Sequence, residues 1–444
     1  MNKRNSTFCA GQPTWTNACV GNNGSPSYVE YAIGFSKAAN LIIDQVLKSR
    51  NLHLSVDEMV YPVCFNMRHS VELRLKGAIE ALKVIAECKG KQLSFDFVGS
   101  HNIGNIWSFF KNKSEIIDER FKEINDRIEP TILDLADVDA TGQTFRYPIN
   151  TESQKHLTDI SIINFIVLKE KFGTLEEELD KLLHLTNFLI EEYSLGSFTN
   201  KLSRCQLFIL ADELPPISSW ICDEFVEIKN SIREKFSLSS NDLSKAIDLI
   251  KSNYELSFKI NKLLPLKGVD EYILIWFLDF WMQINPEILS RQYNVESFEL
   301  NSSDILVGSS GFLESLTRDS KIKGKFKKNL NSYLTAESLA GLKALFYFAH
   351  DKMFSETYVS LYKRELEESK SNIEDGVGAV WDSLMHLADK TNFFDNLVIS
   401  LYFLNYSDLA EELMQIYGTA KAFPWIEKAR SRELYRLPNI AGYA

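Results

Sequence analysis

The chain has 444 residues and a formal net charge of −11, with 45% hydrophobic and 25% charged residues. These proportions are typical of a globular protein, and the length predicts two or three domains with ample buried core. The acidic balance excludes a surface that attracts nucleic acid as a whole, so any nucleic-acid contact must be a local basic patch.

Several classes of protein are disfavoured by the absence of their motifs. The six cysteines form no Cys-x-x-Cys pair, and no further ligands complete a metal pattern. Glycine-rich phosphate-binding motifs are also lacking, so we predict no metal, no cofactor and no conventional nucleotide hydrolysis. The N-terminus has no apolar signal region, and the apolar run 272–284 is too short for a bilayer. We expect a cytoplasmic protein without membrane contact.

The first part of the chain divides into an arm and a group of helices. Residues 1–26, rich in Gly, Asn, Ser and Thr, predict an irregular arm. Apolar residues at helical spacing then predict helices over 28–50, 61–87, 101–112 and 115–135. Pro62 is expected in the first turn of the second helix, where proline is tolerated.

The predicted helix 61–87 carries a charged row beside an apolar stripe. Arg68, Glu72 and Lys76 lie four residues apart and therefore share one face. They form either an exposed ladder of ion pairs, each worth about 0.2–0.5 kcal/mol, or a partly enclosed polar row lining a groove. The apolar stripe comprises Leu75, Ile79, Leu82 and Ala86.

Two histidines are candidates for proton transfer near neutral pH. His69 comes directly after Arg68 in the sequence, so its side chain is turned by about 100° around the helix from the charged row. His101 is expected in the first turn of a helix capped by Ser100. If the two helices pack antiparallel, His101 approaches Arg68 and Glu72. A structural role for either histidine remains the alternative.

The runs 69–76 and 100–107 together resemble the HEPN superfamily. Its nucleotide-binding members carry a helix with Glu-Leu-x-Leu-Lys and then a helix that starts with His-Asp-Leu. Glu72 to Lys76 match the first motif and His101 begins the second, where Asn102 stands in place of Asp. The resemblance covers about residues 27–150. It implies a bundle of four or five helices, homodimerisation through this domain, and roles in RNA cleavage, toxin–antitoxin pairs and phage defence.

One departure from the family affects the expected chemistry. Ribonuclease members have Arg, four to six residues and then His, and this chain contains no such spacing. Either a different site cleaves RNA or the domain is not catalytic. In the first case we expect metal-independent chemistry, with His69 or His101 as general acid or base. Arg68 and Lys76 would stabilise the phosphorane charge, Glu72 would orient Arg68, and Lys76 and Asn102 would contact the ligand.

A loop at 137–148 offers a second set of candidates. Arg146 lies between Phe145 and Tyr147, in a segment whose alternation also fits a short strand or hairpin. Arg146 and Tyr147 can hold an anion or stack on a base. Alternatively the aromatics pack as a plug and Arg146 pairs with Asp137 or Asp139.

After residue 158 the pattern is almost entirely helical. Residues 160–172 and 175–193 predict a helical pair, and 270–284, apolar nearly all round, predicts a central buried helix. The basic run 318–328 contains Lys325, Lys327 and Lys328 around Phe326. It is either a phosphate or RNA contact or a solvated lysine-rich loop.

The sequence thus predicts an all-α protein, with a HEPN-like domain at 27–150 and a larger helical body at 151–444. This body is either solenoid-like or one irregular domain. The first functional hypothesis is an effector that interacts with RNA or nucleotides, including a ribonuclease. The alternative is a non-catalytic scaffold or sensor that binds a partner protein.

Overall fold

The computed structural model describes residues 5–48, 54–150, 152–285, 309–328, 334–419 and 423–443. Regular structure in these ranges is helical, and their β pairing is limited to an isolated bridge between Ile149 and Lys155. The all-α prediction is confirmed, and the segment with strand-like alternation before Ile149 forms a turn instead. None of the helices in these ranges has the length and apolarity that a membrane span requires.

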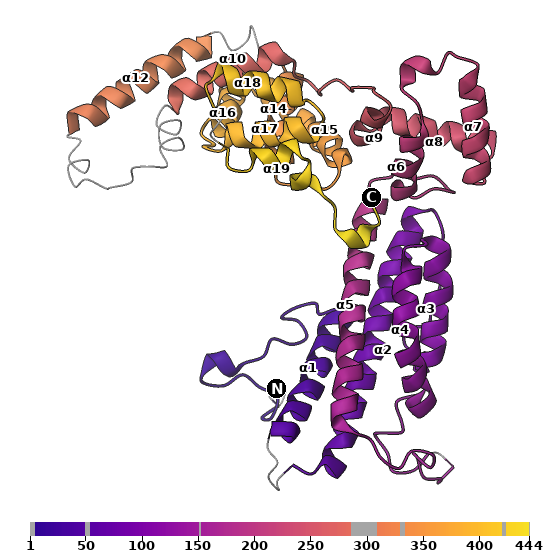
Figure 1. The fold of residues 1–444 in the computed structure, drawn as a ribbon. Helices are drawn as coiled ribbons and strands as arrows, with labels where there is room; N and C mark the ends of the chain where they lie inside the picture. The colour runs from indigo at the N-terminus through magenta and orange to yellow at the C-terminus, as the bar shows by residue number, and fades with distance from the viewer. Residues whose placement is uncertain are drawn as a thin grey trace. The chain divides into compact units, whose positions relative to one another are not determined.

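The chain divides into two compact units, Met1–Ser194 and Leu195–Ala444 (Figure 1). The first unit contains a short 3-10 turn, η1 (Thr14–Thr16), and the helices α1 (Tyr28–Lys48), α2 (Val56–Cys88), α3 (Ile103–Ile117), α4 (Phe121–Asp139) and α5 (Phe165–Ser194). The five helices lie alongside one another (Figure 1). Because α2 contacts α1, α3 and α5, it is the central helix of this unit. The predicted last residues of the first helix, 49 and 50, lie outside the described residues.

The sequence of α2 explains its central place. The predicted apolar stripe is confirmed, since its members are at most 1% exposed: Leu75, Ile79, Leu82 and Ala86. The helix begins earlier than expected, at Val56, with Asp57 and Glu58 favourably placed in its first turn. Pro62 therefore lies inside the helix and not in its first turn.

Helix α5 runs unbroken where the sequence predicted a helical pair. Gly173, between the two predicted helices, lies within α5, where glycine costs about 1 kcal/mol relative to alanine. Phe172, Leu175 and Leu179 form a continuous buried stripe across it, and burial of this stripe overrides the local preference. Since α5 packs on α2 and α4, the first unit extends to Ser194, beyond the expected boundary at 150.

The second unit is also helical in its described part. Its elements are α6 (Arg204–Glu213), η2 (Ile217–Ser219), α7 (Glu224–Lys235), α8 (Ser240–Ser252), α9 (Tyr254–Lys259), α10 (Glu271–Ile284), α12 (Ser309–Lys328), α14 (Ala336–Phe348), α15 (Ser355–Glu374), α16 (Val377–Ala388), α17 (Phe393–Phe403), α18 (Ser407–Ile416), α19 (Ile426–Arg430), η4 (Glu433–Tyr435) and η5 (Asn439–Ala441). Asn253 separates α8 from α9, because its side chain accepts the first amide hydrogens of α9.

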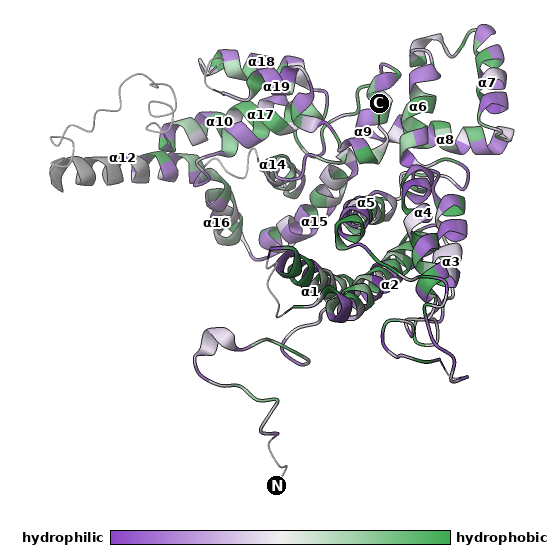
Figure 2. Cartoon of the chain, turned by 60° about the horizontal axis from the view of Figure 1, so that its bottom comes forward, coloured by the Kyte–Doolittle hydropathy of each residue, from purple (hydrophilic) through white to green (hydrophobic). Residues whose placement is uncertain are grey.

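Two apolar cores stabilise the second unit. The smaller core lies among α6 to α9, and the larger one includes residues of α10 and α14 to α18. Helices α10 and α17 are largely green in Figure 2, as their apolar sequences require. The central buried helix predicted at 270–284 is buried along one side, where Leu274, Phe277 and Leu278 are 0% exposed, whereas Tyr272 is 58% exposed and Asp279 lies at the surface. The more deeply enclosed helix is α17. A solenoid arrangement stays a prediction.

Candidate functional site

The charged row on α2 is enclosed in the first unit. The side chains of Arg68, Glu72 and Lys76 are 2%, 4% and 5% exposed. Four-residue steps place them one above the other on the face of α2 that packs into the bundle. Of the two interpretations that the sequence left open, the solvated ladder is therefore excluded.

Arg68 uses its guanidinium to join three segments of the chain. Nε donates to the carbonyl oxygen of Asp139 at 3.2 Å, and Nη2 donates to that of Ala140 at 2.8 Å. Nη2 also donates to the carbonyl oxygen of His101, and Nη1 donates to Glu72. Arg68 thus caps the carboxyl end of α4 and fixes the segment that enters α3.

Gly142 makes room for this guanidinium. Its φ of +76° lies in the left-handed region, and a Cβ there would lie 3.1 Å from Nη1 of Arg68. The carboxylate of the neighbouring Asp139 accepts the amide hydrogen of Thr144 at 3.1 Å. The turn after α4 is therefore shaped around Arg68.

Glu72 is the acceptor at the centre of the cluster. Its Oε1 lies 2.9 Å from Nζ of Lys76 and 3.1 Å from Nδ1 of His101. Nδ1 of His69 lies 3.9 Å from Oε2, and Arg68 donates to that same oxygen. Burial alone would raise the pKa of Glu72, but its contacts with His69 and Lys76 and the charge of Arg68 hold the pKa far below its usual range.

The two histidines are the solvent-accessible members of this cluster. The side chain of His101 is 61% exposed and that of His69 is 30% exposed. Phe35 meets the ring of His69 edge-on at 4.5 Å, and Phe65 stacks on it at 5.6 Å. The expected approach of His101 to Glu72 is confirmed. Because a carboxylate only accepts, this contact directs the proton of His101 to Nδ1 and leaves Nε2 free to accept one.

Asn102, expected to contact the ligand, instead caps α3. Its side chain accepts the amide hydrogen of Asn105 at 3.0 Å. The prediction that Ser100 caps this helix is wrong, because α3 begins at Ile103 and Asn102 is the residue in its N-cap position. His101 consequently precedes the helix and does not lie in its first turn.

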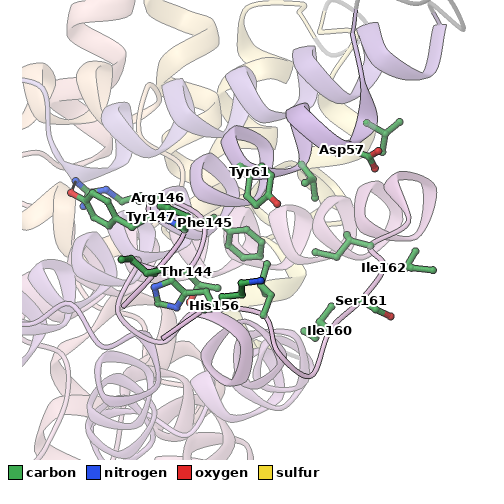
Figure 3. Close-up of a pocket in the computed structure, with 17 residues that line it drawn as sticks. Asp57, Tyr61, Thr144, Phe145, Arg146, Tyr147, His156, Ile160, Ser161 and Ile162 are labelled. Carbon is green, nitrogen blue, oxygen red and sulfur yellow. Dashed lines mark hydrogen bonds between the residues drawn. The ribbon is translucent and has the colours of Figure 1, made fainter. Parts of the chain in front are cut away.

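A pocket of about 920 Å³ opens beside the cluster in the same unit. The start of α2, the turn at 144–149 and the segment 155–163 line it. Figure 3 shows Tyr61 and Phe145 at its middle, Arg146 and Tyr147 toward one end, and Ile160 to Ile162 toward the other. Its volume falls in the range of small-molecule sites.

The turn after α4 presents Arg146 at the surface. Its guanidinium lies 5.5 Å from the ring centre of Phe65 and 5.3 Å from that of Tyr147. Phe145 is buried and Tyr147 is 50% exposed. The predicted pairing of Arg146 with Asp137 or Asp139 is not found, and in the described part of the chain Arg146 forms no ion pair. Its positive charge is therefore available at the rim of the pocket.

An aromatic row on α2 connects the pocket with the cluster. Tyr61, Phe65 and His69 follow one another at four-residue steps, over about 12 Å of helix. Tyr61 lines the pocket, Phe65 lies under Arg146, and His69 faces Glu72. The row thus runs from the pocket to the charged cluster.

The predicted basic run lies in the second unit, on the helix α12. Lys325, Lys327 and Lys328 are exposed. Phe326 packs on Phe280 with ring centres 3.8 Å apart, so it does not offer its ring to a base. The lysine-rich loop is thus a helix, and its lysines alone remain candidates for phosphate contact.

Some lining residues were missed from the sequence. Lys155, His156 and Asp57 also line the pocket, although nothing local in the sequence marks them. Among the described residues no group of three or more His, Cys, Asp or Glu side chains is arranged to hold a metal ion.

No protein-family model, curated protein or solved structure matches this chain. The fold and the site define it as an all-α protein whose first unit places an exposed imidazole on a buried carboxylate, beside an aromatic pocket.

Proposed function

We propose that the first unit is a HEPN-like domain that binds RNA and cleaves it by metal-independent acid–base catalysis. The observation that carries this proposal is the contact between His101 and Glu72, 3.1 Å from Nδ1 to Oε1. A buried carboxylate that holds one nitrogen of an exposed imidazole fixes the tautomer and prepares the other nitrogen to accept a proton. The order and spacing of the two HEPN-like motifs support the domain assignment, whereas cleavage would have to use a site other than the Arg-x(4–6)-His motif of ribonuclease members, which this chain lacks.

The reaction that fits two imidazoles is transesterification of the RNA backbone. The ribose 2′-oxygen attacks the adjacent phosphorus, and the bond from phosphorus to the 5′-oxygen breaks. His101 accepts the proton of the 2′-hydroxyl, and His69 donates a proton to the leaving 5′-oxygen. The products are a 2′,3′-cyclic phosphate and a free 5′-hydroxyl, and this chemistry requires no metal ion.

The burial of the cations changes the roles expected from the sequence. Arg68 and Lys76 are enclosed and engaged with Glu72, so we assign them to positioning. The exposed Arg146 is better suited to contact a phosphate, and Tyr147 offers a half-exposed ring to a base.

The test uses purified protein and a fluorescent RNA oligonucleotide in the presence of EDTA. We expect His101→Ala to reduce cleavage by about 100-fold or more, the usual contribution of general acid–base catalysis. His184→Ala is the matched control, because His184 is exposed on α5 in the same unit. The catalytic proposal fails if RNA stays intact with the wild type, or if His101→Ala and His184→Ala cleave equally well.

A non-catalytic scaffold is the second candidate. It is favoured by Arg68 and Lys76, which have the burial and pairing of structural residues. In that case the wild type leaves RNA intact, and Arg146→Met changes neither RNA binding nor cleavage.

Cytoplasmic location, homodimerisation through the first unit, and a role in phage defence or a toxin system rest on the family resemblance. Light scattering tests homodimerisation, and growth arrest on expression tests the role in defence or as a toxin.

A further inference from the structure

A groove in the second unit, between α7 and α8, concentrates positive charge in an acidic chain. Its volume is about 360 Å³. Lys229 and Arg233 lie four residues apart on α7, and Lys251 faces them from α8. Asp248 is the one carboxylate among the lining residues, which leaves two positive charges in excess. All of these residues were absent from the sequence-based predictions.

Aromatic rings contact the two lysines, and a backbone carbonyl contacts Arg233. Nζ of Lys229 lies 5.0 Å from the ring centre of Phe225, and Nζ of Lys251 lies 4.9 Å from that of Trp220. The two rings stack on each other with centres 4.7 Å apart. Nε of Arg233 donates to the carbonyl oxygen of Leu238 at 3.5 Å.

Other lysines in this part of the chain have carboxylate partners. Lys235, two residues beyond Arg233, pairs with Glu213, and Lys259 on α9 pairs with Asp212. By contrast, none of the three groove cations forms an ion pair within the described residues, although each is partly buried. Keeping like charges together without partners costs free energy, and a bound anion would remove this cost.

We propose that this groove binds a polyphosphate group through Lys229, Arg233 and Lys251. Several phosphate oxygens can meet three cations at once, and charge-assisted hydrogen bonds to phosphate are strong. The rings of Trp220 and Phe225 cover each other and are covered outside by lysines, so they leave no face for a nucleobase. The groove therefore recognises the phosphates and not the base. Its volume suits a small molecule and not a folded nucleic acid.

The experiment is isothermal titration of the full chain with inorganic tripolyphosphate and, separately, with a nucleoside triphosphate. We expect both to bind, with affinity that falls as salt rises. The double substitution Lys229→Gln and Lys251→Gln should weaken binding at least tenfold, since it removes two charge-assisted contacts. Lys245→Gln, the same change at an exposed site on α8 outside the groove, should leave binding unchanged.

Each other outcome has a defined meaning. A nucleoside triphosphate that binds while tripolyphosphate does not would overturn recognition by phosphate. A single-stranded RNA that binds through the same lysines while both small ligands fail would overturn the small-molecule assignment in favour of RNA. Absence of binding by any of these probes overturns the site. If the double variant unfolds, the charge-preserving pair Lys229→Arg and Lys251→Arg must still bind tripolyphosphate. Because these residues lie in the second unit, this result is independent of RNA cleavage by the first.

Discussion

The assignment of Arg68 as a structural clamp predicts a large loss of stability when its charge is removed. The substitution Arg68→Met keeps a side chain of similar length but deletes every hydrogen bond of the guanidinium. Three backbone carbonyls and one oxygen of Glu72 then lose a donor inside the bundle. Breaking a buried ion pair by removing one partner costs about 3–5 kcal/mol.

This cost converts into a measurable shift in melting temperature. For a unit of this size, Met1–Ser194, 1 kcal/mol corresponds to about 2–4 °C. Arg68→Met should therefore lower the first melting transition by about 6–20 °C, measured by circular dichroism or calorimetry. Lys122→Met is the control, because Lys122 is 65% exposed and its pair with the 51% exposed Asp126 lies at the surface. Exposed pairs are worth about 1 kcal/mol or less, so the control should shift by at most a few degrees.

A double substitution separates the ion pair from general packing. Arg68→Met combined with Glu72→Met removes both charges, so it should cost less than the sum of the two single changes. The reasoning is refuted if Arg68→Met melts no lower than Lys122→Met. A guanidinium that stabilises nothing would instead be free to act on a ligand, as the sequence alone suggested.

Three further predictions address the same unit. The folded-state pKa of Glu72 lies far below its unfolded value of about 4.3, so the stabilisation that Glu72 provides is present above about pH 5 and is lost as the pH falls toward the folded pKa. Glu72→Gln should therefore flatten the acid side of a curve of unfolding free energy against pH. An unchanged slope on the acid side would contradict this. Burial raises the pKa of Cys64 to about 12, so iodoacetamide at pH 8 should label the exposed Cys222 in the native protein and Cys64 only after unfolding, as mass spectrometry can show. Gly142→Ala should lower the free energy of unfolding, measured in urea, by about 1–2 kcal/mol, because Gly142 has a left-handed φ and lies close to Arg68. An unchanged free energy of unfolding would mean that the turn relaxes freely.

Helix periodicity predicted the core of the first unit well because it depends on local spacing. The stripe on α2 is buried as its spacing required. Local signals failed where tertiary packing decided the outcome. The break predicted between residues 172 and 175 is absent because the buried face of α5 continues across it, and Ser100 seemed a cap where Asn102 provides one.

The candidate site was predictable in its members but not in their roles. Four-residue spacing identified Arg68, Glu72 and Lys76 as one row. Whether that row faces solvent depends on the end of α4, some seventy residues away in sequence, where Ala140 supplies an acceptor. The local pattern at 145–147 marked one edge of the pocket, but its other lining residues and those of the basic groove come from separate segments that nothing in the local sequence marks.

The clamp made by Arg68 also constrains how a nascent chain reaches its native state. Its acceptors lie 33, 71 and 72 residues further along the chain, at His101, Asp139 and Ala140. Until Ala140 has left the ribosome, the guanidinium cannot be enclosed without unmet hydrogen bonds, and the charged face of α2 must stay hydrated. We therefore expect the face of α2 around Arg68 to close only after residue 140 has been synthesised, and a fragment that ends before Ala140 to be cut by proteases faster than the complete unit.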